Sequence, residues 1–250
     1  MIRLSVNVNK IATLRNSRGG RVPSVVEAVQ TCLAAGAAGI TVHPRADRRH
    51  ITPEDVRQIA GVLRAHAPAV EFNIEGDPRP DLLDLVAEVR PDQCTLVPVV
   101  AGEITSQAGW QPGPGTERLP GVVDRLRGMG VRVSLFVDAQ EDPVRWAASI
   151  GANGVELYTE PFARAFELGP DPALRSFAHY ADVARLAHSL GLAINAGHDL
   201  DLGNLPTFRT LPFLAEVSIG HAIVSRAVFV GLSTVVREYL QVLSNQEPGT

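Results

Sequence analysis

The chain has 250 residues with a formal net charge of -4 at pH 7, and 45% of its residues are hydrophobic. This length fits one large α/β domain, so we expect residues 1–250 to form a single domain. The small net charge provides no general attraction to nucleic acid or to a membrane surface, and any anion site must therefore be local. We accordingly expect small molecules as partners, with no nucleic acid and no membrane.

The apolar segments near both ends differ from export or membrane segments. Residues 4–8 alternate between apolar and polar side chains, which is typical of a strand and not of a signal peptide. Residues 222–236 are apolar but are interrupted by Ser225 and Arg226, and the run is too short to cross a bilayer. We therefore expect a cytoplasmic protein.

Two residue types are used sparingly. Cys32 and Cys94 lack the spacing of a metal site or a redox pair, so we expect two buried, reduced thiols. Lys10 is the single lysine among 23 lysine and arginine residues. Either a bias in composition explains this, or a site requires a compact ammonium group where a planar guanidinium would not serve.

Short β-rich runs recur along the whole chain and alternate with segments of helical periodicity. The eight expected strands are residues 4–8, 39–43, 70–75, 93–98, 131–138, 154–159, 192–197 and 216–220. The helical segments between them are residues 23–36, 52–67, 80–89, 117–130, 142–151 and 171–191. This alternation favours an α/β fold, a (β/α)8 TIM barrel with extra helical and loop elements, and an open doubly wound sheet is the alternative.

Two connections are longer than the loops that usually follow barrel strands. The first spans residues 99–116, and the second spans residues 160–172 and contains the run PFARAF. In a barrel both would lie on the face that carries the active site, so we expect lids that shield reactive intermediates from water. The alternative is two surface loops without a role in catalysis.

The ends of the expected strands supply three titratable groups, His43, Glu75 and His198. Burial and neighbouring charges can move the pKa values of such groups toward neutrality, as general acid and base catalysis requires. A metal site of two histidines and one carboxylate is the alternative use of the same residues. The sequence shows no Walker loop, no GxGxxG motif and no nucleophile elbow, and we expect neither a cofactor nor a metal.

The last two expected strands end in NAGH and SIGH, and the second leads directly into a helical segment. Small residues at a helix N-terminus let backbone N–H groups approach an anion, which predicts a phosphate site there. Arg18, Arg45 and His50 follow the first two strands and predict a second anion site on the opposite wall. Two anion sites imply two phosphorylated substrates or one bisphosphate.

Six long stretches cover essentially the whole chain: VNVNKIATLRNSRGG, AGITVHPRADRRHIT, FNIEG, VSLFVD, NAGHDL and IGHAIVSRAV. In their order and spacing they resemble the pyridoxine 5'-phosphate synthase family. The resemblance implies a (β/α)8 barrel, a homo-oligomer assembled from dimers into an octamer, that condenses 3-amino-2-oxopropyl phosphate with 1-deoxy-D-xylulose 5-phosphate. The products would be pyridoxine 5'-phosphate, phosphate and water.

The resemblance also implies roles for individual residues. His43 and Glu75 correspond to proton acceptors, and His198 corresponds to a proton donor. The residues implied for substrate binding are Asn7, Arg18, Gly220 and His221 for the aminoketone phosphate, and Arg45, His50 and Thr105 for the xylulose phosphate.

Four positions depart from the best known family members. Asn9 and Lys10 stand where an acid and a histidine contact sugar hydroxyls, and Asp199 stands where a glycine is familiar. We expect all three to remain substrate-binding positions, with Lys10 neutralising an oxygen and Asp199 contributing its backbone amide. Tyr158 stands where a histidine is common.

Two other functions are compatible with the same barrel. In a Schiff-base lyase or aldolase, Lys10 would be the covalent amine. In a phosphate-binding barrel without activity, the acid and base groups would be lost, yet His43, Glu75 and His198 are all present.

Overall fold

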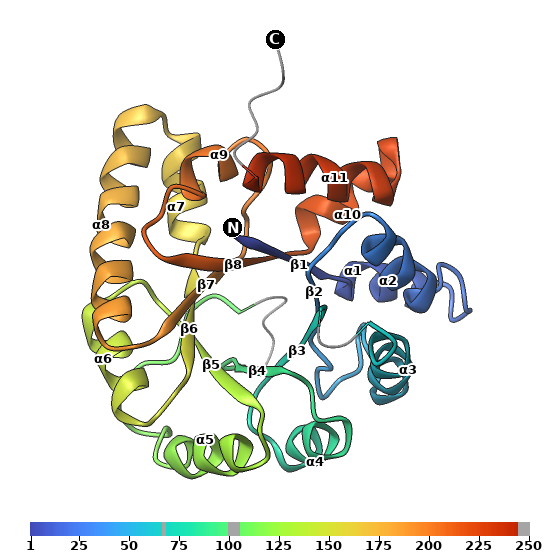
Figure 1. Cartoon of the computed structure of the whole chain (residues 1–250), viewed down its shortest axis with the longest axis horizontal. Helices are drawn as coiled ribbons and strands as arrows, with labels where there is room; N and C mark the ends of the chain where they lie inside the picture. The colour runs from blue at the N-terminus through green and yellow to red at the C-terminus, as the bar shows by residue number, and fades with distance from the viewer. Residues whose placement is uncertain (67–68, 100–105, 245–250) are drawn as a thin grey trace.

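The structure is a computed structural model that describes residues 1–66, 69–99 and 106–244. Within these residues, eight parallel strands close into a barrel in chain order, with β8 paired to β1 (Figure 1). The strands are β1 (Arg3–Asn7), β2 (Gly39–Val42), β3 (Glu71–Gly76), β4 (Gln93–Leu96), β5 (Arg132–Val137), β6 (Gly154–Tyr158), β7 (Ala193–Gly197) and β8 (Leu214–Ile219). The predicted barrel is confirmed, and the strand ends differ from expectation by at most two residues.

Helices surround the barrel (Figure 1). In the described part of the chain they are α1 (Asn9–Asn16), α2 (Val25–Ala34), α3 (Pro53–Leu63), α4 (Pro80–Val89), α5 (Leu119–Gly128), α6 (Glu141–Ser149), α7 (Glu160–Glu167), α8 (Pro170–Ser189), α9 (Leu205–Phe208), α10 (His221–Val230) and α11 (Leu232–Leu243). Helices α1, α7, α9 and α11 lie outside the segments in which the sequence predicts a helix. None of the described helices is both long and apolar enough to cross a membrane.

The strand sequences place polar side chains inside the barrel and apolar side chains outside. In β3, Phe72 and Ile74 are buried in the hydrophobic core between the strands and the helices, while Glu71, Asn73 and Glu75 occupy the alternate positions and face the barrel interior. Barrel interiors are more often filled with branched apolar residues. A polar interior requires internal hydrogen bonds, because buried polar groups without partners cost free energy.

Side chains in the middle of the barrel supply such bonds across β1 to β4. Ser5 Oγ lies 2.7 Å from Thr41 Oγ1. Thr95 Oγ1 donates to Asn73 Oδ1 at 3.0 Å, and Asn73 Nδ2 donates to Thr41 Oγ1 at 3.4 Å. These bonds join four neighbouring strands and stabilise the register on which the site above them is built.

Charged residues close the end of the barrel at which the strands begin. Arg3 Nη2 lies 2.8 Å from a carboxylate oxygen of Glu71 and 3.3 Å from one of Glu216, and Arg132 also pairs with Glu71. Burial, together with the neighbouring Glu71 carboxylate, raises the pKa of Glu216 to about 8. This end of a (β/α)8 barrel contributes to stability, whereas the opposite end carries the active site.

The prediction of a loop at residues 160–172 is wrong, because this segment forms α7 and the start of α8. Pro161 lies in the first turn of α7, where a missing N–H group breaks no helical hydrogen bond. Phe162 is fully buried and packs against Phe208, with ring centroids 5.0 Å apart. Burial of this apolar face makes α7 a fixed part of the barrel wall.

The first long connection is irregular over its described residues 106–116, as the sequence predicts. It is nevertheless anchored to the barrel. Trp110 Nε1 donates to the Leu96 carbonyl at 3.0 Å, and the Gly109 N–H donates to Asp138 Oδ1 at 2.9 Å. A Cβ atom at Gly109 would meet the Val137 backbone at 2.3 Å, so glycine allows this close approach.

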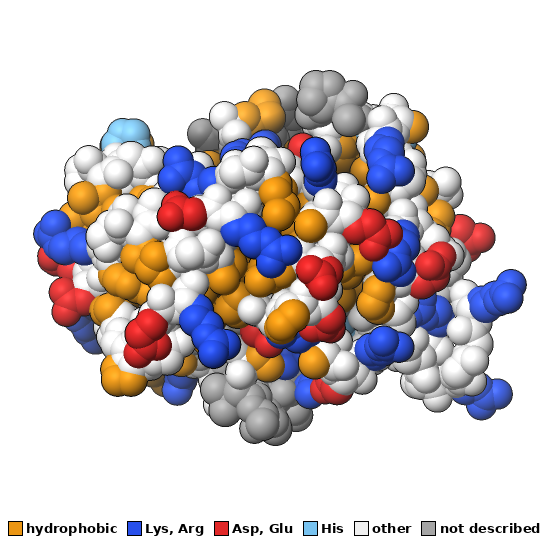
Figure 2. All heavy atoms as spheres, turned by 90° about the horizontal axis from the view of Figure 1, so that it is seen from below, with side chains coloured by type: hydrophobic (Ala, Val, Ile, Leu, Met, Phe, Trp, Pro, Cys, Tyr) orange, Lys and Arg blue, Asp and Glu red, His pale blue; other side chains and the backbone are white. Residues whose placement is uncertain are grey.

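The outer surface carries mixed charges. Seen from the side on which α4 and α5 lie in Figure 1, basic and acidic side chains are interspersed (Figure 2). Arg57 of α3 pairs with Glu88 of α4 at 2.7 Å, and Arg125 of α5 lies 3.5 Å from Asp84 of α4. Exposed pairs of this kind contribute little to stability, and their balance agrees with the small net charge.

Candidate active site

A cavity of about 1190 Å³ opens at the carboxyl ends of the strands. The predicted site residues that line it are Asn7, Asn9, Lys10, His43, Arg45, His50, Glu75, His198, Asp199, Gly220 and His221. Arg18 is exposed in the segment after α1 and is not among the lining residues, so the structure does not bring it to the site. Thr105 lies outside the described residues, and its role stays a prediction.

Side chains of the site tie together the ends of β1, β2 and β3. Asn7 Oδ1 accepts a hydrogen bond from the Asn9 N–H at 3.0 Å, and Asn7 Nδ2 donates to Glu75 Oε2 at 3.4 Å. Asn9 Oδ1 accepts from the backbone N–H of His43 at 2.9 Å. An aspartate at position 9 would offer the same acceptor oxygen, so the departure to Asn9 preserves the support of His43.

His43 is buried beside Glu75, with Nδ1 3.8 Å from Glu75 Oε2. Its Nε2 is buried and has no hydrogen-bond partner among the described residues. Burial and the nearby Arg45 guanidinium lower the pKa of His43 well below its usual value. The imidazole is therefore neutral at pH 7 and has an unprotonated nitrogen that can accept a proton.

Burial raises the pKa values of two carboxyl groups of the site. Burial raises the pKa of Glu75 to about 8, although the Arg45 guanidinium opposes the shift. Burial, together with Glu75, also raises the pKa of Glu156 well above its usual value. Glu156 lines the cavity, and the sequence prediction gives it no role. Its inward-facing position in the middle of β6 is the sequence signal that points to it.

The backbone at the end of β7 adopts an unusual conformation. His198 and Asp199 have φ angles of 74° and 57°, in the left-handed region that favours glycine. Thr159 Oγ1 donates to the His198 carbonyl at 2.6 Å, and Asn204 Nδ2 donates to the Asp199 carbonyl at 2.9 Å. These side chains hold a strained turn that directs His198 into the cavity, and such strain is concentrated at functional sites.

Aromatic side chains surround the His198 ring. The ring centroid of Phe136 lies 4.8 Å from that of His198, and the Tyr158 centroid lies 5.4 Å away. Burial, with a smaller contribution from Arg45, lowers the pKa of His198 to about 4. Tyr158, which stands where the family resemblance suggests a histidine, thus packs against the His198 ring and adds no second imidazole.

The segment between β2 and α3 brings Arg45 and His50 to the cavity. His50 Nδ1 accepts a hydrogen bond from the N–H of Ile51 at 2.9 Å. Burial lowers the pKa of His50 to about 4, with Arg45 and Lys10 adding to the shift. Arg45 and Lys10 therefore bring basic side chains to this wall, while His50 is neutral at pH 7.

Gly220 and His221 form a second wall at the N-terminus of α10. Because β8 and β2 both pair with β1, this wall lies next to that of Arg45 and His50, so the prediction of opposite walls is wrong. A Cβ atom at position 220 would meet the Asn7 carbonyl oxygen at 2.8 Å, so only glycine lets β8 and β1 approach this closely. The first N–H groups of a helix have no partners within the helix and attract anions. The wall therefore offers backbone N–H groups to an anion, and the phosphate site there stays a prediction.

Helix α7 contributes a further wall that the sequence prediction treats as a loop. Its residues Glu160, Arg164 and Glu167 line the cavity. Burial and the neighbouring Glu160 raise the pKa of Asp199, while His221 opposes the shift. The cavity is thus acidic near α7 and basic near β2. No group of three or more His, Cys, Asp or Glu side chains in the described part of the chain could hold a metal ion.

Solved structures with low sequence identity share the fold. Thiamine phosphate pyrophosphorylase from Pyrococcus furiosus has a TM-score of 0.63 and 12% identity, with coverage of 97% of this chain and 96% of that one. Phosphoribosyl anthranilate isomerase from Thermotoga maritima has a TM-score of 0.60 and 13% identity, with coverage of 98% and 100%. At this identity the likeness shows the barrel fold alone.

Closer relatives identify the family. The chain is 48% identical over 254 residues to pyridoxine 5'-phosphate synthase of Leptospira biflexa serovar Patoc, covering 98% of each sequence. It is 49% identical over 257 residues to the enzyme of the same name from Xanthomonas oryzae pv. oryzae, covering 99% of each. Residues 4–245 match the family described as "Pyridoxal phosphate biosynthesis protein PdxJ". The barrel and the cavity that contains the predicted acid and base groups agree with these matches, and the chain belongs to this family of pyridoxine 5'-phosphate synthases.

Proposed function

We propose that the chain condenses 3-amino-2-oxopropyl phosphate with 1-deoxy-D-xylulose 5-phosphate to give pyridoxine 5'-phosphate, phosphate and water. The observation that carries the proposal is the convergence of His43, Glu75 and His198 in one cavity with a basic wall and a helix N-terminus. Such a cavity suits two phosphorylated substrates whose condensation needs several proton transfers.

The three titratable groups suit different proton transfers. His43 is neutral and is proposed as a proton acceptor. Glu75, with its pKa raised by burial to about 8, can exchange a proton near neutral pH. Burial lowers the pKa of His198 to about 4, and a phosphate dianion bound nearby would raise it, because an opposite charge favours the charged form. His198 would then gain its proposed role as donor when substrate binds.

The two walls suit different phosphate groups. We assign the xylulose phosphate to the wall with Arg45 and His50, where a guanidinium can make two parallel hydrogen bonds to a phosphate. We assign the aminoketone phosphate to Gly220 and His221, where the α10 N-terminus attracts an anion. Asn7 lies between these walls and contacts Glu75. Separate walls would keep the two substrates in a fixed relative orientation.

The departures from the family pattern keep this chemistry possible. Lys10 lines the cavity near enough to His50 to lower that residue's pKa, and we propose that it binds a substrate oxygen. The pKa of the Asp199 carboxyl is raised by burial and by Glu160, so this carboxyl gives up its proton less readily than an ordinary aspartate and repels phosphate less. Asp199 can then offer its backbone amide to the anion.

We also propose that the chain forms a homo-oligomer, an octamer built from dimers as the family resemblance implies. Helix α10 supports an apolar contact between copies. The side chains of Val228 and Phe229 are 72% and 86% exposed, and Val230 next to them is 41% exposed. Contiguous exposed apolar side chains of this size are typical of interaction surfaces.

The function is tested by incubating the purified protein with both substrates and measuring pyridoxine 5'-phosphate by chromatography and released phosphate by colorimetry. We expect equal amounts of the two products, and none when either substrate is omitted. Borohydride added during turnover should leave the protein unlabelled. Absence of both products, together with a reduced substrate adduct on Lys10, would instead support the lyase or aldolase.

A further inference from the structure

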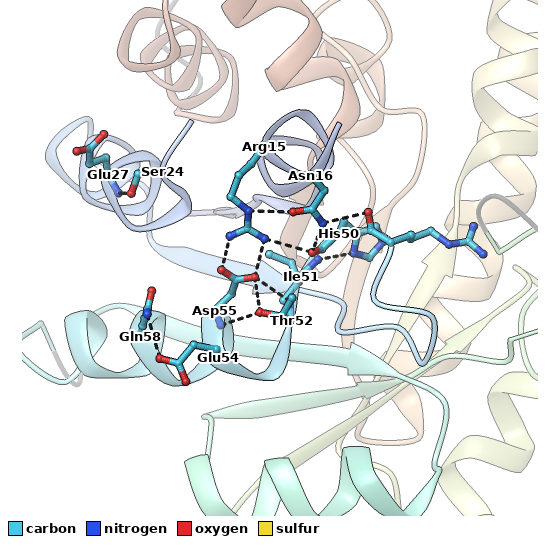
Figure 3. Close-up of polar contacts among 11 residues, drawn as sticks. Arg15, Asn16, Ser24, Glu27, His50, Ile51, Thr52, Glu54, Asp55 and Gln58 are labelled. Carbon is cyan, nitrogen blue, oxygen red and sulfur yellow. Dashed lines mark hydrogen bonds and ion pairs between the residues drawn. The ribbon is translucent and has the colours of Figure 1, made fainter. Parts of the chain in front are cut away.

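Side chains of α1 bind the backbone of His50 (Figure 3). Asn16 Nδ2 donates to the His50 carbonyl oxygen at 2.9 Å, and Arg15 Nη2 donates to the same oxygen at 3.4 Å. Arg15 Nε also donates to Asn16 Oδ1 at 2.9 Å. Neither Arg15 nor Asn16 lines the cavity, so both act on the site only through the segment that carries His50.

Asp55 of α3 anchors Arg15 (Figure 3). Arg15 Nη1 lies 2.5 Å from Oδ1 of Asp55, and Nη2 lies 2.9 Å from Oδ2, which makes a bidentate pair. Asp55 Oδ2 also accepts from the N–H and the hydroxyl of Thr52, both at 2.8 Å. Burial raises the pKa of Asp55, but the bonds from Arg15 and Thr52 outweigh burial and lower it below its usual value. The pair therefore stays ionised at neutral pH.

We call the bonded side chains of Arg15, Asn16 and Asp55 the brace. The brace acts on the imidazole ring of His50 through one peptide unit. The His50 carbonyl and the Ile51 N–H belong to the same planar peptide, so fixing the direction of one fixes the other. That N–H donates to His50 Nδ1 at 2.9 Å. A nitrogen that accepts a hydrogen bond carries no proton, so the neutral ring carries its proton on Nε2. His50 thus presents an N–H donor on the side of the ring away from its own backbone.

We propose that Arg15, Asn16 and Asp55 are positioning residues that keep His50 in this tautomer, as a fixed donor to the phosphate of 1-deoxy-D-xylulose 5-phosphate. The identity of that ligand rests on the proposed function. Without the brace, the peptide between residues 50 and 51 can turn and Nδ1 loses its donor. The ring then exchanges between tautomers, and in one of them an unprotonated Nε2 faces the phosphate oxygens.

A purely structural role is the competing explanation, because Thr52 and Asp55 also form the capping box of α3. The loss of a cap destabilises the fold without preference for one ligand, whereas the loss of the brace weakens one phosphate site. Ser24 provides a matched control. Its hydroxyl caps α2 by accepting from the Glu27 N–H at 3.2 Å, and it does not line the cavity (Figure 3).

The experiment compares Asn16→Ala, Asn16→Asp and Asp55→Asn with Ser24→Ala. Asn16→Asp keeps the acceptor for Arg15 but removes the donor to His50, and agreement with Asn16→Ala excludes an effect of charge. For each of the three variants we expect KM and calorimetric Kd for 1-deoxy-D-xylulose 5-phosphate to rise about tenfold, the effect of one lost hydrogen bond to a charged group. We expect kcat and the KM for 3-amino-2-oxopropyl phosphate to be unchanged. Ser24→Ala should lower the unfolding temperature and leave both KM values unchanged.

Nitrogen-15 NMR of the histidine rings gives a readout that needs no ligand. The His50 resonances, assigned with His50→Gln, should show a protonated Nε2 and an unprotonated Nδ1 in the wild type, and averaged shifts in the variants. Folded Asn16→Ala and Asp55→Asn proteins with wild-type shifts and wild-type KM values would overturn the inference, even if the proposed reaction proceeds. If the shifts change as expected but the wild type forms no product, the positioning of His50 by the brace is supported and the proposed function is contradicted.

Discussion

His43, Glu75 and His198 come from three different parts of the barrel, yet all line one cavity and contribute little to the packing between strands and helices. We therefore expect His43→Ala, Glu75→Gln and His198→Ala each to leave the fold intact and to lower kcat by roughly two to four orders of magnitude. Steady-state kinetics with circular dichroism as the folding control test this expectation. Near wild-type turnover in all three variants would show that the assignment is wrong.

The raised pKa of Glu75 predicts how stability depends on pH. Burial raises this pKa from 4.5 to about 8, so between these values the unfolded chain releases a proton that the folded chain retains. Stability from this group is therefore lost as the pH rises. We subtract the free energy of unfolding of the wild type from that of Glu75→Gln. This difference should increase with pH by at most about 1.4 kcal/mol per pH unit between about pH 5 and about pH 8. Urea denaturation at several pH values measures the difference, and a difference that does not change with pH would contradict the prediction.

Lys10 tests whether the site needs a compact cation. The residue lines the cavity but is exposed, so it contributes little to the core. We expect Lys10→Arg to reduce turnover nearly as much as Lys10→Met, because a guanidinium overfills the space around a substrate oxygen. The unfolding temperature should barely change in either variant. Normal kinetics of Lys10→Arg would indicate that the single lysine reflects composition alone.

At the scale of elements, we propose one anion site in the segment between β2 and α3 and the other at the N-terminus of α10. Arg45→Ala should therefore weaken the xylulose phosphate by about tenfold to more than a hundredfold and leave the aminoketone phosphate nearly unaffected. Isothermal titration calorimetry with each ligand separately distinguishes the sites. Equal weakening of both ligands would indicate one shared phosphate site.

The strands could be predicted from the sequence because period-two alternation persists even when the inward side chains are polar, as in the EFNIE run of β3. Helix α7 was missed because its proline and the nearby Gly169 and Pro170 resemble a loop, although Pro161 lies in the first turn, where helices accept proline. Helix α1 was missed because it follows β1 after a single residue and is short. Local signals therefore located the strands better than the helices near the cavity.

The candidate site was predictable as far as it depends on strand ends. Active-site residues of a (β/α)8 barrel follow the carboxyl ends of the strands, and the sequence prediction selected His43 and His198 for this reason. The sequence prediction did not include the effect of Glu75 on the pKa of Glu156, because this effect depends on distances across the barrel. It also placed Arg18 at the cavity, whereas the folded segment after α1 exposes that side chain.

At the scale of the whole molecule, the exposed face of α10 predicts the assembly. Phe229→Asp should reduce the molar mass measured by light scattering, because a carboxylate on each copy opposes burial of this face. Leu174→Asp on α8 is the control, since Leu174 is 61% exposed and its chain neighbours are the buried Ala173 and the exposed Arg175. The control should keep the wild-type mass. An unchanged mass in Phe229→Asp would place the contact between copies elsewhere.

The position of Lys10 also has a practical consequence for labelling the protein. Since it is the only lysine of the chain, an amine-directed reagent finds a single ε-amino group, and that group lies at the mouth of the cavity. A fluorophore attached there would report directly on whether the cavity is occupied. Protection of the same amine by added substrate, followed by mass spectrometry, would measure occupancy without any engineered residue.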